Sequence, residues 1–159
     1  SFTCKNGSTK VGSYGDYALR SFPKSIPVDF GGVLTGKKVD RTNEFFNLEM
    51  HNTVQDIFSS YSGYLTSFSK QRSANYQQIV NALGDVKEIY HFQKGNDPFV
   101  FGFYSDQYKS IYQALDTPNG VIQMGRTHVA EHVLLPVNPF LNSTQIDQML
   151  NLVVDSMKS

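Results

Sequence analysis

Residues 46–68 read FNLEMHNTVQDIFSSYSGYLTSF. Apolar side chains recur in this segment every three or four positions, which is the spacing of a helix with one apolar face. They are Phe46, Met50, Val54, Ile57, Phe58, Tyr61, Leu65 and Phe68. The pattern predicts one helix of about six turns. Gly63 lies inside it and costs about 1 kcal/mol relative to alanine, so we expect a bend near residues 59–63.

The pattern changes after this helix. A second helix is predicted over residues 73–83, with Gly84 at the position after the helix where a positive φ is needed. Residues 86–92 and 99–104 are then rich in aromatic and β-branched side chains, and the turn-forming sequence QKGNDP joins them. This arrangement predicts a β-hairpin with a longer loop.

The remaining elements follow from local signals. We expect a third helix capped by Ser105, a last helix that begins with a capping box at Asn142, and strands over residues 17–22, 28–34, 121–124 and 127–137. Because strands and helices mix without strict alternation, the predicted class is α+β. In the predicted fold, a mainly antiparallel sheet packs against one long helix and three shorter helices. No linker divides the chain, so we expect a single domain over residues 1–159 with a loop-rich N-terminal arm over about residues 1–41.

Composition excludes several functional classes. The chain has 14 Lys and Arg and 14 Asp and Glu, so its formal net charge is zero. A dedicated nucleic-acid binder normally has a basic excess, so we expect no nucleic-acid partner. A single cysteine excludes a disulfide framework and a multi-cysteine metal site. No phosphate-binding or dinucleotide-binding motif occurs, so no cofactor is expected, and no apolar run is long enough to span a membrane.

Two features favour an extracytoplasmic location, either secreted or periplasmic. Asn, Ser, Gln and Tyr supply much of the polar surface that Lys and Glu usually supply, and the chain begins at Ser1 rather than at methionine. We therefore expect an exported protein.

Residues 125–132 read GRTHVAEH and contain an H-x-x-E-H motif. The motif resembles the signature of the inverted-motif zinc peptidases related to insulin-degrading enzyme and pitrilysin. The resemblance implies that His128 and His132 bind zinc from one face of a helix. It also implies that Glu131 acts as the general base on a metal-bound water.

This sequence departs from that family in two respects. The family needs a further glutamate ligand downstream, and none follows Glu131. Val129, Val133 and Pro136 favour a strand over a helix, and on a strand Glu131 points away from the two histidines. We therefore expect no bound metal and keep a zinc-dependent hydrolase as the alternative function.

Aromatic side chains crowd the predicted hairpin. The candidate binding residues are Tyr90, Phe92, Phe99, Phe101 and Phe103. The last three alternate along the chain and therefore share one face of the sheet. That face is either core, packed on the long helix, or in part a recognition surface, because Tyr and Phe anchor many protein interfaces.

These observations predict a non-enzymatic protein-binding or assembly domain of an exported protein. The chain lacks a complete catalytic constellation in sequence, its net charge is zero, and its expected partner is another protein. A third hypothesis is a secreted effector whose site lies around His51 and His91.

Overall fold

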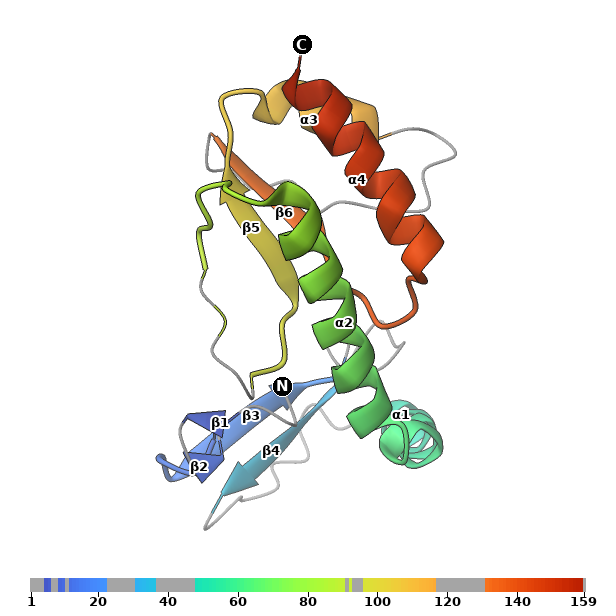
Figure 1. Ribbon diagram of the computed structural model, residues 1–159. Helices are drawn as coiled ribbons and strands as arrows, with labels where there is room; N and C mark the ends of the chain where they lie inside the picture. Colours follow the sequence, from blue (N-terminus) through green and yellow to red (C-terminus); the bar gives the residue numbers. More distant parts are fainter. Residues whose placement is uncertain are drawn as a thin grey trace. The chain divides into compact units, whose positions relative to one another are not determined.

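The computed structural model describes residues 5–6, 9–10, 12–22, 31–36, 48–90, 92, 96–116 and 131–158. These residues form four α-helices and three two-stranded antiparallel sheets (Figure 1). In chain order the elements are β1 (Lys5–Asn6), β2 (Thr9–Lys10), β3 (Tyr17–Ser21), β4 (Gly32–Gly36), α1 (Leu48–Ser62), α2 (Leu65–Leu83), β5 (Val100–Tyr104), α3 (Tyr108–Leu115), β6 (His132–Pro136) and α4 (Ser143–Met157). The predicted α+β class with antiparallel strands is confirmed.

The chain divides into two compact units. The first contains Ser1–Phe68 and Lys94–Asp97, and the second contains Ser69–Gln93 and Pro98–Ser159. The division falls inside α2, after its first turn. The single domain expected over residues 1–159 stays a prediction. A division into compact units does not establish whether each unit folds alone.

The long helix lies elsewhere than expected. The helix predicted over residues 46–68 is divided at Gly63, at the end of the segment where a bend was expected: α1 ends just before Gly63 and α2 begins two residues after it. Glycine weakens a helix, and the Ser62 hydroxyl donates to the carbonyl of Ser59 (3.1 Å), which competes with regular helical bonding. α2 has 19 residues and includes the second predicted helix. It ends before Gly84, whose φ of 56° confirms the predicted glycine signal.

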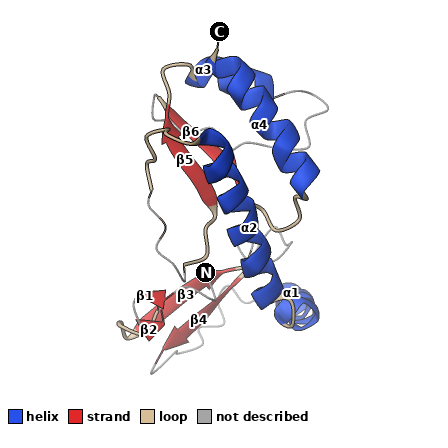
Figure 2. Ribbon diagram, viewed as in Figure 1, coloured by secondary structure: helices blue, strands red, loops and turns tan. Residues whose placement is uncertain are grey.

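The core of the second unit lies between β5, β6 and the helices α2, α3 and α4. The structure shows α3 against both α4 and β6 (Figure 2). Phe101 pairs with Leu135, and Phe103 pairs with Val133. These four side chains share one face, and each is at most 1% exposed. Burying an apolar side chain of this size contributes about 1.5–3 kcal/mol, so this face stabilises the unit.

The strand that pairs with β5 also differs from the prediction. The expected hairpin joined residues 86–92 to residues 99–104, whereas β5 pairs over its length with β6. The described part of the 86–92 segment contributes an isolated bridge, from Glu88 to Phe103. Its prediction as a regular strand was therefore wrong, although its position beside β5 was correct.

The other local predictions have mixed outcomes. β3 confirms the strand at 17–22, and the described end of the 28–34 segment lies in β4. The segment 121–124 lies outside the described residues, and β6 covers the end of the segment 127–137. Ser105 does not cap α3 directly. Its hydroxyl accepts the backbone N–H two residues later (3.2 Å), so it closes the turn before the helix.

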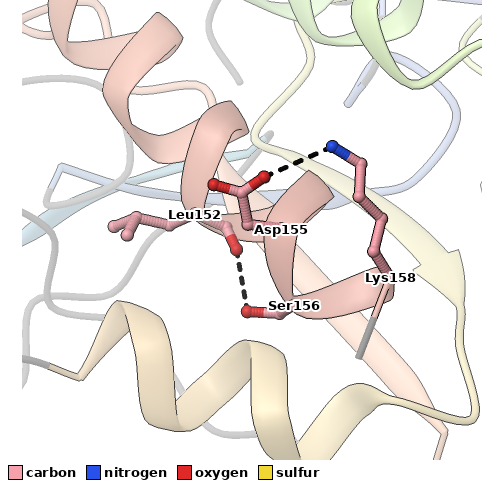
Figure 3. Close-up of polar contacts among 4 residues, drawn as sticks. All are labelled: Leu152, Asp155, Ser156 and Lys158. Atoms are coloured by element: carbon pink, nitrogen blue, oxygen red, sulfur yellow. Dashed lines mark hydrogen bonds and ion pairs between the residues drawn. The ribbon is translucent and has the colours of Figure 1, made fainter.

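The start of α4 matches its prediction. The Gln145 N–H donates to Oδ1 of Asn142 (2.9 Å), and the Asn142 N–H donates to Oε1 of Gln145 (3.0 Å). These are the two bonds of a capping box. At the other end of α4, the Ser156 hydroxyl donates to the backbone carbonyl of Leu152 (2.8 Å). Nζ of Lys158 lies 3.3 Å from Oδ1 of Asp155 (Figure 3). That ion pair is exposed and contributes little to stability.

In the first unit, β3 and β4 are joined to α1 through Phe22. This side chain is buried, and its ring stacks on Phe58 of α1 at a centroid distance of 5.0 Å. Gly31 makes the close approach possible. It has a φ of 97°, and a Cβ there would lie 3.1 Å from both the Phe22 ring and Val54. Only glycine adopts this conformation without strain.

Candidate functional site

The five aromatic residues predicted to bind a partner lie in different environments. Phe101 and Phe103 are 1% and 0% exposed and belong to the core of the second unit. Phe99 is half-buried, and the guanidinium carbon of Arg72 lies 5.1 Å from the centroid of its ring. The face that the three phenylalanines were expected to share is therefore a core face at Phe101 and Phe103. Neither has surface available to a partner in this structure.

Tyr90 and Phe92 lie outside this core face. Phe92 meets Tyr76 of α2 edge to face, with ring centroids 5.3 Å apart, and is half-buried. Tyr90 covers Gly102 on the other side of β5, where a Cβ would lie 3.2 Å from its ring. Tyr90 is 52% exposed, which makes it the most exposed of the five predicted binding residues.

Tyr76 connects α2 to the segment before β5. Its hydroxyl donates to Oε2 of Glu88 (3.1 Å). Burial, followed by the hydrogen bond to Glu88 and the negative charge of Glu88, raises the pKa of Tyr76 to about 12. The phenol therefore stays protonated at neutral pH and remains a hydrogen-bond donor. This contact therefore stabilises the packing of α2 against the segment before β5.

The described end of the H-x-x-E-H motif is not helical. Glu131 is exposed and has a φ of 66°, whereas a right-handed helix needs a negative φ at this residue. His132 is the first residue of β6, and its ring meets Tyr104 edge to face at 4.8 Å. The sequence preference for a strand is confirmed at His132. These two residues do not have the helical geometry that a zinc-peptidase motif requires.

The other histidines named from the sequence are placed in part. His128 and His91 lie outside the described residues, and His51 lies in α1. Among the residues that the structure describes, no group of three or more His, Cys, Asp or Glu side chains lies close enough to hold a metal ion. The effector hypothesis around His51 and His91 stays a prediction.

Large side chains are exposed on one face of the β3–β4 pair. Tyr17, Leu19 and Leu34, hereafter the hairpin face, are 57%, 78% and 50% exposed. Leu19 lies opposite Leu34, and Tyr17 lies opposite Gly36. The three side chains therefore point to the same side of the sheet. The Tyr17 ring lies over Gly36, so close that a Cβ at this position would overlap it.

The opposite face of the same strands is the more buried one. It carries Ala18, Arg20 and Val33, which are all half-buried. The chain before β3 approaches this side, because a Cβ on Gly12 would lie 3.2 Å from Cβ of Ala18. Antiparallel sheets with one covered face normally turn their apolar side chains inward and their polar ones outward. Here the largest apolar side chains are the exposed ones.

Sequence reasoning did not select the hairpin face. The alternation in YALRS and GVLTG was visible, and it shows which residues share a side of each strand. It does not show which side packs against the rest of the chain. That depends on Phe22 and Gly31, which direct the strands onto α1.

Two further results bear on function. In the described part of the chain, no helix is both long enough and apolar enough to cross a membrane. Comparisons with protein-family models, with curated proteins and with solved structures found no match. The function must therefore be argued from the geometry itself.

Proposed function

We propose that this chain is a non-enzymatic protein-binding domain of an exported protein, and that its hairpin face contacts the partner. The observation that carries the proposal is the outward position of Tyr17, Leu19 and Leu34 on one side of a sheet. Single exposed apolar residues are common on protein surfaces, but a group of them on one face is typical of interaction sites. Tyrosine in particular is enriched among the residues that dominate binding energy.

The hairpin face is the centre of a larger contact. Burying the exposed parts of these three side chains contributes about 3–6 kcal/mol. Association itself costs about 4–15 kcal/mol, and a stable interface buries about 800 Å² on each partner. The partner must therefore also contact residues around Tyr17, Leu19 and Leu34.

Charge and composition support further features of this proposal. The first 41 residues have seven Lys and Arg against three Asp and Glu. A partner with net negative charge complements this excess of positive charge, and complementary charges mainly increase the rate of encounter. The abundance of Asn, Ser, Gln and Tyr supports an exported protein.

Affinity capture from extracts of the source cells tests the proposal. Leu19→Ser is compared with Leu152→Ser, a matched control in α4, where the leucine is 43% exposed. Both variants replace an exposed leucine, so neither removes a core side chain. We expect quantitative mass spectrometry to recover the same partner with the wild type and with Leu152→Ser. Recovery should fall at least tenfold with Leu19→Ser, and equal recovery with the two variants would contradict the proposal.

A further inference from the structure

A pocket with a volume of about 420 Å³ lies beside Tyr104 in the second unit. Its lining residues come from the end of α2, the segment after it, the end of β5, the turn before α3, the residue before β6 and the end of α4. Clefts that bind small ligands have volumes of about 300–1,000 Å³. This pocket therefore has the size of a ligand site.

Backbone hydrogen bonds fix the walls of the pocket. The Tyr104 N–H donates to the carbonyl of Lys87 (3.0 Å), and the Ser105 N–H donates to the carbonyl of Glu131 (2.9 Å). Tyr104, the last residue of β5, is thus bonded to the segment after α2, and Ser105 is bonded to the residue before β6. A site held in this way needs little ordering when a ligand binds.

The Tyr104 ring already holds a cation of the chain itself. Tyr104 is 39% exposed, and the Lys87 ammonium lies 4.9 Å from the centroid of its ring. His132 meets the same ring edge to face at 4.8 Å. Cations within about 6 Å of an aromatic centroid are attracted by the electron-rich face of the ring. Lys87 therefore already occupies a face of this ring, so an incoming cation is attracted by the neighbouring carboxylates rather than by the ring.

The other lining residues combine negative charge with an apolar surface. Three exposed carboxylates line the pocket, and they belong to Asp85, Asp106 and Glu131. The apolar part is formed by Leu83, Val86 and Met157, which also pack against the core. A cation on an alkyl stem matches both surfaces, because its stem covers apolar atoms while its head remains among charges.

We propose that this pocket binds the side chain of an arginine or lysine in a basic peptide segment. The stem lies on Leu83, Val86 and Met157, and the charged head lies among the carboxylates beside Tyr104. Arginine fits better than lysine, since its guanidinium forms paired hydrogen bonds with carboxylates. The inference uses residues of the second unit alone, so it does not depend on the hairpin face.

An NMR titration of the full-length chain tests this inference. The probe is acetyl-Gly-Gly-Arg-Gly-Gly-amide, and its comparison is the same peptide with neutral citrulline in place of arginine. We expect the arginine peptide to shift the amide signals of residues 104–107 and to bind at least fivefold more tightly than the citrulline peptide. Equal binding of the two peptides, or shifts that do not include these residues, would overturn the assignment.

Charge-removing variants and a small cation complete the test. The double variant Asp106→Asn with Glu131→Gln should weaken binding of the arginine peptide at least fivefold. Asp155→Asn, which removes an exposed carboxylate of α4 outside the pocket, should leave binding unchanged. An undiminished affinity in the double variant would refute the role of the carboxylates. If n-butylguanidinium, a free alkylguanidinium with no second charge, binds as tightly as the peptide, the ligand is a small cation and the peptide assignment fails.

Discussion

Two glycines of the first unit illustrate how local geometry decides the effect of a single methyl group. Gly31 has a φ of 97°, and a Cβ there would lie 3.1 Å from Phe22 and Val54, whereas a Cβ on Gly63 has no atom within 4 Å. We expect Gly31→Ala to destabilise the protein by about 1–3 kcal/mol. Gly63→Ala should be neutral or stabilising by up to about 1 kcal/mol. Thermal unfolding measures both, and equal melting temperatures for the two variants would contradict the packing of Phe22 onto α1.

Asn75 is a buried polar residue whose side-chain amide both donates and accepts hydrogen bonds. It is 1% exposed, and its amide donates to the carbonyls of Asn138 (2.8 Å) and Leu141 (3.1 Å) in the loop before α4. Asn75→Ala leaves both carbonyls without this donor, so we expect a loss of about 2 kcal/mol in urea unfolding. Asn81→Ala is the matched control, because Asn81 lies exposed on the same helix. A loss of similar size in both variants would show that the hydrogen bonds from Asn75 to the loop contribute no more to stability than the exposed side chain of Asn81.

At the scale of the element, α4 was the most predictable part of the chain. Its start is encoded by Asn142 and Gln145, and its buried face by Ile146, Met149 and Val153, all within one local segment. The pairing of β5 with β6 could not be predicted in the same way. Phe103 lies opposite Val133, 30 residues further along the chain, and local propensity contains no information on such distant partners. The nearer segment 86–92 was therefore expected to pair with β5 as a regular strand, whereas its described part forms an isolated bridge to β5.

The capping box yields a direct prediction for α4. Asn142→Ala removes the acceptor for the Gln145 N–H and should cost about 1 kcal/mol. Asn151→Ala, a change inside the same helix at an exposed position, should be neutral or slightly stabilising because alanine has the higher helix propensity. Chemical denaturation of the two variants measures the difference. Equal stabilities would mean that the cap contributes nothing to the helix.

Tyr76 joins α2 to the segment before β5, and this contact predicts a pH dependence. Burial and Glu88 raise the pKa of Tyr76 to about 12 in the folded state, from 10.0 for the free side chain. The folded state thus favours the neutral phenol. The resulting stability is complete below pH 10 and falls as the pH rises from 10 to 12.

Urea unfolding across this pH range compares the wild type with Tyr76→Phe. The stability of the wild type should fall more steeply, because the phenylalanine variant has no phenol to ionise at this position. Tyr14→Phe is the control, since Tyr14 is 72% exposed. If Tyr76→Phe follows the wild type in parallel, the contact with Glu88 does not contribute to the pH dependence.

At the scale of the whole molecule, the sequence predicted the fold class better than the candidate site. Phe101 and Phe103 were read as either core or recognition residues, and their burial places them in the core. The hairpin face was missed because Leu19 and Leu34 look like ordinary inward-facing strand residues. Their exposure depends on how Phe22 directs the strands onto α1, which is a property of tertiary packing.

The central claim is that the hairpin face binds a protein partner. The most direct measurement is the dissociation constant of the captured partner for the wild type, Leu19→Ser and Leu152→Ser, obtained by isothermal titration calorimetry. The account predicts at least tenfold weaker binding for Leu19→Ser, which corresponds to about 1.4 kcal/mol, and unchanged binding for Leu152→Ser. The same dissociation constant for Leu19→Ser and the wild type, with both chains folded, would contradict it.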